Sequence, residues 1–101
     1  MVKSELIEVL CKKLPDLQPR DVELALNCML EQMAEILESG ERVEIRDFGS
    51  FNLKIRQPRL ARNPKTGEAV KLPSKSVVHF KPGKQLKDRV NDSREKCSIK
   101  D

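Results

Sequence analysis

The sequence predicts an α+β fold: two helices, then an antiparallel sheet with a projecting β-arm, then a short final helix. Apolar residues recur at helical spacing as far as Gly40. Beyond Gly40 the apolar period changes to two, which indicates strands. From Lys54 to Lys75 the chain carries seven Lys or Arg, one acidic residue and few large apolar side chains. This stretch is therefore expected to project from the body.

Helix-bounding residues mark the two N-terminal helices. Ser4 is a candidate N-cap of the first helix, and Pro15 is expected to stop it. Pro19 suits the first position of the second helix, and Gly40 suits its C-terminus. The apolar stripe of the second helix is broad, so we expect it to be buried in a dimer interface as well as against the first helix.

Three strands are expected after the helices. A turn at Asp47 to Gly49 joins the first two, and Pro82-Gly83 ends the third before a helix from Lys84 to Asn91. The second strand is expected to run on into an arm over about residues 56–76, which turns at Pro64 to Gly67. The strand positions are Val43 and Ile45, Phe51 to Ile55, and Val77 to Phe80.

The arm is long for so small a protein. From Arg56 to Pro64 an extended chain covers roughly 26 Å, at ~3.3 Å per residue. A chain of 101 residues with three Phe and neither Trp nor Tyr has little material left for a core. We therefore expect obligate oligomerisation.

Charge is divided unevenly along the chain. Residues 1–50 hold six basic and eleven acidic residues, whereas residues 51–101 hold fourteen basic and five acidic ones. This asymmetry predicts a cationic binding half. The basic segment lacks an amphipathic helical pattern, and no apolar run is long enough to span a membrane. Nucleic acid is thus the expected partner, rather than a membrane.

Catalytic and metal-binding patterns find little support. His79 has no second histidine or cysteine spaced to share a metal, so a structural or surface role is expected. Cys11 and Cys28 are expected to be small buried hydrophobes, and Cys97 a free surface thiol. We expect no enzyme activity, no cofactor, no metal and no small-molecule substrate. The start of the chain carries no signal-peptide pattern, so a reducing cytoplasm is expected.

The candidate binding residues each have a plainer explanation. The cations of the arm could serve only to keep a loop in solution, although long structureless insertions in small domains are uncommon. Pro64, considered alone, could be a turn-former or a wedge. Arg42, Glu44 and Arg46 lie on a short strand and could form no more than an exposed cross-strand ion pair.

Three motifs resemble the HU/integration host factor family: Ile45 to Phe51, Arg62 to Gly67, and His79 to Lys84. The similarity covers residues 1 to about 91 and points to the beta-subunit branch of integration host factor. Arg-Asn-Pro at the arm tip is a highly specific motif. Residues 1–91 are thus expected to form the domain, and residues 92–101 a polar, frayed tail.

The resemblance implies an intertwined dimer whose β-arms lie in the minor groove of double-stranded DNA. Pro64 matches the family's wedge proline, which inserts between base pairs and kinks the duplex. The partner would be the integration host factor alpha subunit or a second copy of this chain. The other site residues that the resemblance implies are Arg56, Arg59, Arg62, Asn63 and Lys65 in the minor groove, Arg42, Glu44 and Arg46 for sequence readout, and Lys3, Ser4, Lys75, Lys81, Gly83 and Lys84 at phosphates.

The chain departs from the family pattern at a few positions. Asp47 stands where the family usually has glycine; because aspartate tolerates left-handed backbone, the turn is expected to survive. Leu60, Ala61 and residues 72–74 differ along the arm.

The expected function is that of an architectural protein of the bacterial nucleoid, which bends DNA for recombination, replication and the regulation of transcription and translation. One alternative is an HU-type compactor that ignores sequence. An RNA-binding protein is a second alternative, but the chain lacks exposed aromatic residues for base stacking.

Overall fold

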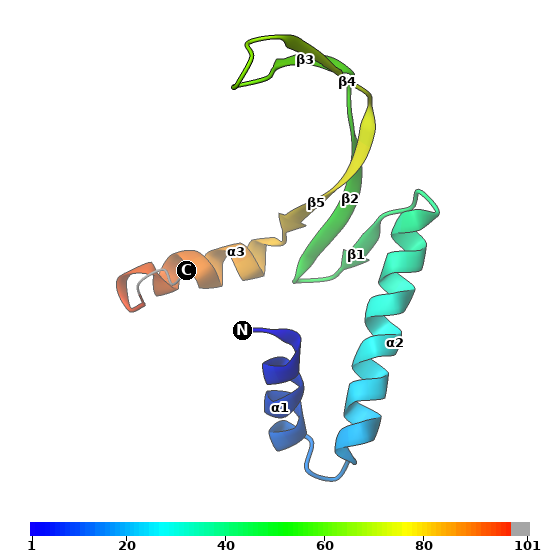
Figure 1. Cartoon of the computed structure of the whole chain (residues 1–101). Helices are drawn as coiled ribbons and strands as arrows, with labels where there is room; N and C mark the ends of the chain where they lie inside the picture. Colours follow the sequence, from blue (N-terminus) through cyan, green and yellow to red (C-terminus); the bar gives the residue numbers. More distant parts are fainter. Residues whose placement is uncertain (98–101) are drawn as a thin grey trace.

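A computed structural model of the chain describes residues 1–97 and confirms the α+β architecture. Helices α1 and α2 form a hairpin beside the sheet, the arm curves away above it, and α3 extends to one side (Figure 1). The elements are α1 Lys3–Lys13, α2 Pro19–Glu38, β1 Val43–Ile45, β2 Gly49–Arg56, β3 Arg59–Arg62, β4 Ala69–Leu72, β5 Lys75–Pro82, α3 Lys84–Asp92 and the 3₁₀ turn Ser93–Glu95.

The ends of α2 follow the sequence signals. Pro19 occupies the first helical position, where its missing N–H costs nothing. At the other end Gly40 adopts φ +90°; its N–H donates to the Leu37 carbonyl at 3.1 Å, while the Glu41 N–H donates to the Ile36 carbonyl at 3.2 Å. These bonds make a Schellman motif, which satisfies carbonyls that the helix end leaves open.

The start of α1 differs from the prediction. The helix begins at Lys3 with Val2 as its N-cap, and no side chain caps it. Ser4 lies inside the first turn, so the assignment of Ser4 as N-cap is wrong. The Leu6 N–H already donates to the Val2 carbonyl at 3.1 Å, two residues earlier than a Ser4 cap would allow.

The main sheet is antiparallel with the order β1-β2-β5. The β1–β2 turn places Asp47 at φ +67°, the left-handed conformation expected of it, and the Phe48 N–H donates to the Ile45 carbonyl at 3.0 Å. Strand β5 runs from Lys75 to Pro82 and is longer at both ends than the predicted strand.

The arm is not one continuous ladder. Strands β3 and β4 form a two-stranded sheet of their own, separated from the main sheet at Pro58 on one strand and Pro73 on the other. Proline has no N–H to donate, so both strands lose a ladder bond near the same level. The expectation that the second strand simply continues into the arm was therefore incomplete.

The two faces of the main sheet differ in chemistry. Residues that pair directly across antiparallel strands share a face, and alternate residues change face. Ser50 pairs with Lys81, Asn52 with His79 and Arg56 with Lys75, on the side that we call the cationic face. On the opposite side, the Phe80 ring lies 4.8 Å from that of Phe51 and 5.7 Å from that of Phe48.

A single protomer has almost no interior. Among the side chains that the structure describes, Val22 is the one buried apolar residue, at 4 % exposure. The chain exposes 9412 Å², against roughly 5,800 Å² for a compact monomer of this mass. Its radius of gyration is 19.2 Å, where about 13 Å is usual for this length. Such a protomer needs apolar surface from another chain.

The broad apolar stripe of α2 is a part of the protomer that remains uncovered. Leu24 and Met29 each remain 61 % exposed, and Cys28 is exposed as well. The prediction that Cys28 is buried is therefore wrong for the protomer alone, whereas Cys11 is half-buried and Cys97 is exposed as predicted. The exposed part of α2 is consistent with the expected dimer interface.

Stability is consequently expected to depend on protein concentration. For a folded dimer in equilibrium with unfolded chains, each tenfold rise in concentration adds about 1.4 kcal/mol to apparent stability. The thermal midpoint measured by circular dichroism should therefore rise with concentration. A midpoint that stays constant over a hundredfold range would show that the protomer is stable alone.

The C-terminal segment continues in helical conformation beyond the predicted helix. Asp92 still belongs to α3, and a 3₁₀ turn follows over Ser93–Glu95. Within residues 92–97 the predicted frayed tail therefore has regular structure, and residues 98–101 lie outside the described part of the chain.

Candidate nucleic-acid interface

The arm tip is a turn organised by Asn63. Its backbone N–H donates to the Glu68 carbonyl at 2.8 Å, and its carbonyl accepts from the Gly67 N–H at 2.7 Å. Its side-chain Oδ1 accepts from the Lys65 N–H at 2.9 Å. Asn63 therefore holds the shape of the tip, a role that the minor-groove assignment did not include.

Pro64 lies at the exposed end of this turn, between Asn63 and Lys65. Gly67 closes the turn at φ +73°, and Arg62 Nη1 donates to the Gly67 carbonyl at 3.3 Å. A rigid ring is thus held clear of the body, next to two cations.

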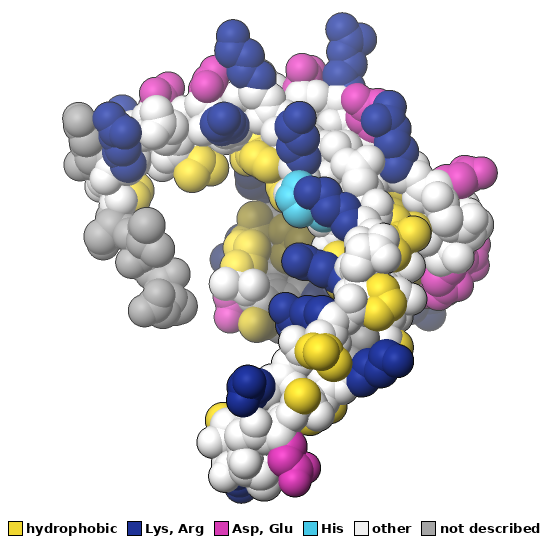
Figure 2. Space-filling view, turned by 90° about the horizontal axis from the view of Figure 1, so that it is seen from above, with side chains coloured by type: hydrophobic (Ala, Val, Ile, Leu, Met, Phe, Trp, Pro, Cys, Tyr) yellow, Lys and Arg dark blue, Asp and Glu magenta, His cyan; other side chains and the backbone are white. Residues whose placement is uncertain are grey.

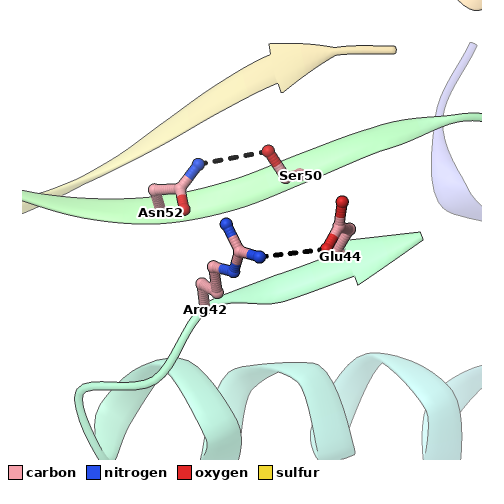
Figure 3. Close-up of polar contacts among 4 residues, drawn as sticks. All are labelled: Arg42, Glu44, Ser50 and Asn52. Atoms are coloured by element: carbon pink, nitrogen blue, oxygen red, sulfur yellow. Dashed lines mark hydrogen bonds and ion pairs between the residues drawn. The ribbon is translucent and has the colours of Figure 1, made fainter. Parts of the chain in front are cut away.

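The predicted readout residues lie at the edge of the cationic face. Arg42 Nη2 and Glu44 Oε2 form an ion pair at 3.1 Å, with side chains 65 % and 64 % exposed (Figure 3). On the neighbouring strand Asn52 Nδ2 donates to Ser50 Oγ at 3.1 Å, beside this pair. The expected ion pair is present, but both partners come from the β1 segment rather than from facing strands.

One open hollow gathers several of the predicted groups. It brings the readout residues together with three phosphate candidates from the end of β5 and the start of α3. Ser50 and Asn52, which sequence reasoning missed, also line it; the polar alternation of β2 was the signal that could have found them. The lining residues are Arg42, Glu44, Ile45, Arg46, Asp47, Gly49, Ser50, Asn52, Lys81, Pro82, Gly83 and Lys84.

Gly83 makes a contact that the prediction did not include. Its N–H donates to the Phe48 carbonyl at 2.8 Å, so this N–H is not free for a phosphate. A phosphate contact at Gly83 would therefore not use this N–H, and the assignment of Gly83 stays a prediction. Gly83 also ties α3 to the β1–β2 turn. Helix α3 has no side-chain cap, so the N–H groups of its first turn, beginning with Lys84, remain open to an anion.

Lys3 and Ser4 stand at the start of α1 and are not among the residues lining the hollow. Arg56, Arg59 and Lys75 gather instead at the break in the arm, around a second hollow that Pro58 and Pro73 also line. Lys and Arg side chains recur along the sheet and the arm in Figure 2. Most of the predicted site residues thus form three clusters, in the open hollow, at the break in the arm and at its tip, while Lys3 and Ser4 stand apart.

Other site chemistry is sparse in the described part of the chain. His79 is exposed on the cationic face opposite Asn52. No group of three or more His, Cys, Asp or Glu within residues 1–97 could hold a metal ion. In the same residues no helix has both the length and the apolar composition to cross a membrane.

Known proteins share both the sequence and the fold. The family described as "Bacterial DNA-binding protein" matches residues 1–91. Integration host factor subunit beta of Alkalilimnicola ehrlichii is 64 % identical over 94 residues, which cover 93 % of this chain and 94 % of the relative. The protein of the same name from Methylococcus capsulatus is 60 % identical over 101 residues and the full length of both.

Solved structures agree. An HU–DNA cocrystal structure from Anabaena matches with a TM-score of 0.82 at 33 % identity, over 89 % of this chain and 97 % of that one. HU from Thermotoga maritima matches with a TM-score of 0.62 at 36 % identity, over 89 % and 98 %. The expectation that the protein is not an enzyme is confirmed, because these relatives are DNA-binding proteins. The chain belongs to the HU/integration host factor family of bacterial DNA-binding proteins.

Proposed function

We propose that this chain is a subunit of an architectural protein that lays its arm in the DNA minor groove and bends the duplex by inserting Pro64. The observation that carries the proposal is the arm tip itself. Pro64 stands exposed on a hydrogen-bonded turn, flanked by Arg62 and Lys65, at the end of a cationic arm. The test is whether the purified protein bends a labelled duplex, with the bend measured by fluorescence energy transfer.

The energetics favour a surface rich in cations. Sharp bending costs on the order of 1–6 kcal/mol by smooth elastic estimates. For minor-groove architectural proteins, a class that includes HU and integration host factor, unstacking adds a few kcal/mol per step. Phosphate neutralisation offsets these costs. The clusters at the arm break, at the arm tip and at the start of α3 each supply cations.

The salt dependence of binding should be steep. If the dimer makes about ten phosphate contacts, the logarithm of the affinity should fall against the logarithm of salt concentration with a slope near −9. Titrations by fluorescence anisotropy measure this slope. They should span roughly 50 to 200 mM salt, the range over which affinity falls steeply. A slope shallower than about −4 would show that the proposed clusters do not all reach the DNA.

We propose that the working species is a dimer, because the protomer exposes the apolar part of α2 and carries one arm. The names of the relatives support the integration host factor alpha subunit as partner, and a second copy of this chain is the alternative. Native mass measurement of the protein purified from its own cells separates the two. Recovery of a single chain species at twice the protomer mass would favour the homodimer.

We propose that the readout residues at the β1 edge of the sheet, Arg42, Glu44 and Arg46, help to select the DNA site. We expect Glu44→Gln to leave stability within about 1 kcal/mol, because both partners of its ion pair are exposed. Loss of the carboxylate should leave Arg42 without orientation and reduce the preference for a specific bent site over random duplex about fivefold, or ~1 kcal/mol. Competition binding measures this preference.

Glu41→Gln is the matched control, since Glu41 is an exposed acid of the same segment outside the hollow. It removes the same charge and should leave the preference unchanged. An equal effect of both variants would assign the change to net charge. Comparable binding of the unmodified protein to specific and random duplex would favour the HU-type compactor, and preference for single-stranded RNA would favour an RNA-binding protein.

We further propose that residues 1–91 act as one DNA-binding domain and that residues 92–101 are a separate tail. Residues 1–91 are those that the family match covers, which supports this division. From the proposed bending activity we further propose that the protein acts in the bacterial nucleoid, in the cytoplasm. The processes it would serve there are recombination, replication and the regulation of transcription and translation. Deletion of residues 93–101 should leave DNA bending unchanged.

A further inference from the structure

Leu60 is an exposed apolar residue on the side of the arm that carries Arg62 and Lys71. It lies in β3 with 72 % of its side chain exposed, directly across from Lys71 and two residues before Arg62. Residues that pair across a ladder or lie two apart on a strand share a face, so the leucine projects between two cations. Figure 2 shows hydrophobic side chains set between Lys and Arg along the arm.

Val70 pairs with Ala61 and lies on the opposite side of the β3–β4 sheet from Leu60, because adjacent residues of a strand alternate in face.

We propose that Leu60 is a specificity-determining residue that favours A·T over G·C pairs in the minor groove beside the kink. An A·T pair presents only acceptors there, whereas a G·C pair adds the guanine N2 amino donor. An aliphatic side chain on the groove floor would bury that donor without a partner, which carries a cost. The inference rests on the proposed function, because it requires the arm to occupy the minor groove.

The position of the affected base pairs follows from the strand. Leu60 precedes Pro64 by four residues, or roughly 13 Å at ~3.3 Å per residue. Because base pairs repeat about every 3.4 Å, the leucine should meet pairs about three to five steps from the step that Pro64 enters.

The experiment uses the full chain in its solution assembly and three duplexes. A nick fixes the kink in each duplex, and only the pairs three to five steps from it differ: A·T, G·C, or inosine·C, which keeps the major-groove edge of G·C but lacks the amino group in the minor groove. We expect A·T and inosine·C duplexes to bind alike and the G·C duplex to bind about fivefold more weakly, the lower end of the usual effect of one changed pair.

Two variants assign the effect. Leu60→Ala should bring the three affinities within twofold of one another. Val70→Ala, the matched truncation on the opposite side of the arm, should keep the fivefold difference. Circular dichroism verifies that both variants are folded.

The possible outcomes distinguish failure of the Leu60 proposal from failure of the proposed function on which it rests. If the inosine·C duplex binds as weakly as the G·C duplex, or if Leu60→Ala keeps the difference, the role of Leu60 is overturned. Bend angles are measured on the same duplexes by fluorescence energy transfer. Normal bending together with a failed base test overturns Leu60 alone, whereas absence of bending overturns the proposed function and Leu60 with it.

Discussion

Replacing Gly49 with alanine is expected to lower the free energy of unfolding by about 3 kcal/mol, the upper end of the usual cost of overpacking. A Cβ at this position would lie 2.6 Å from Phe80 Cζ and 2.7 Å from the Lys81 carbonyl oxygen. The ring can move away only at the cost of its contacts with Phe48 and Phe51. The strand cannot move either, because Gly49 pairs with Pro82 in the β2–β5 ladder.

Chemical denaturation at fixed protein concentration measures this loss. Gly67→Ala is the control, because a Cβ there meets nothing within 4 Å and only the φ of +73° resists the substitution. It should cost about 1 kcal/mol, within the arm tip alone. Equal losses for the two variants would show that backbone conformation, rather than the close approach of β5, makes Gly49 necessary.

Pro64→Ala is expected to reduce the DNA bend sharply while it lowers affinity less. The cations beside the tip remain in the variant, so phosphate binding persists, but the rigid ring that we propose opens the base step is gone. Fluorescence energy transfer between dyes at the duplex ends gives the bend angle, and anisotropy gives the affinity. An unchanged bend angle would remove Pro64 from the mechanism.

Pro58→Ala is the matched control for this experiment. It removes a proline from the same arm at the break, six residues before Pro64 and well away from the tip. The variant should bend DNA as the unmodified protein does. If Pro58→Ala straightened the duplex as much as Pro64→Ala, arm rigidity rather than wedge insertion would explain the bend.

The sequence predicts the elements well where local chemistry decides them. Gly40 ends α2 because it alone accepts the left-handed backbone there, and Pro19 begins the helix because it needs no donor. Asp47 adopts the left-handed turn for a similar local reason. The order of helices, strands and arm follows from periodicity, which is also a local property.

Features that depend on distant partners could not be predicted. The Gly83 N–H donates to the carbonyl of Phe48, a residue 35 positions away along the chain. The sequence alone therefore does not show that this N–H is already hydrogen-bonded. Cys28 lies on the same helix as the buried Val22, but its side chain is exposed in the protomer, so any burial of Cys28 depends on a second chain. The missing Ser4 cap reflects a helix start two residues earlier than predicted, which side-chain preference does not fix.

The break at Pro58 and Pro73 has a consequence for how the molecule tolerates change. Because β3 and β4 form a sheet of their own, opening of the tip does not require opening of the main sheet. Amide hydrogens of the tip should exchange with solvent independently of those in β2 and β5. Substitutions between the two prolines can thus alter the arm tip while the fold of the body that carries it is preserved.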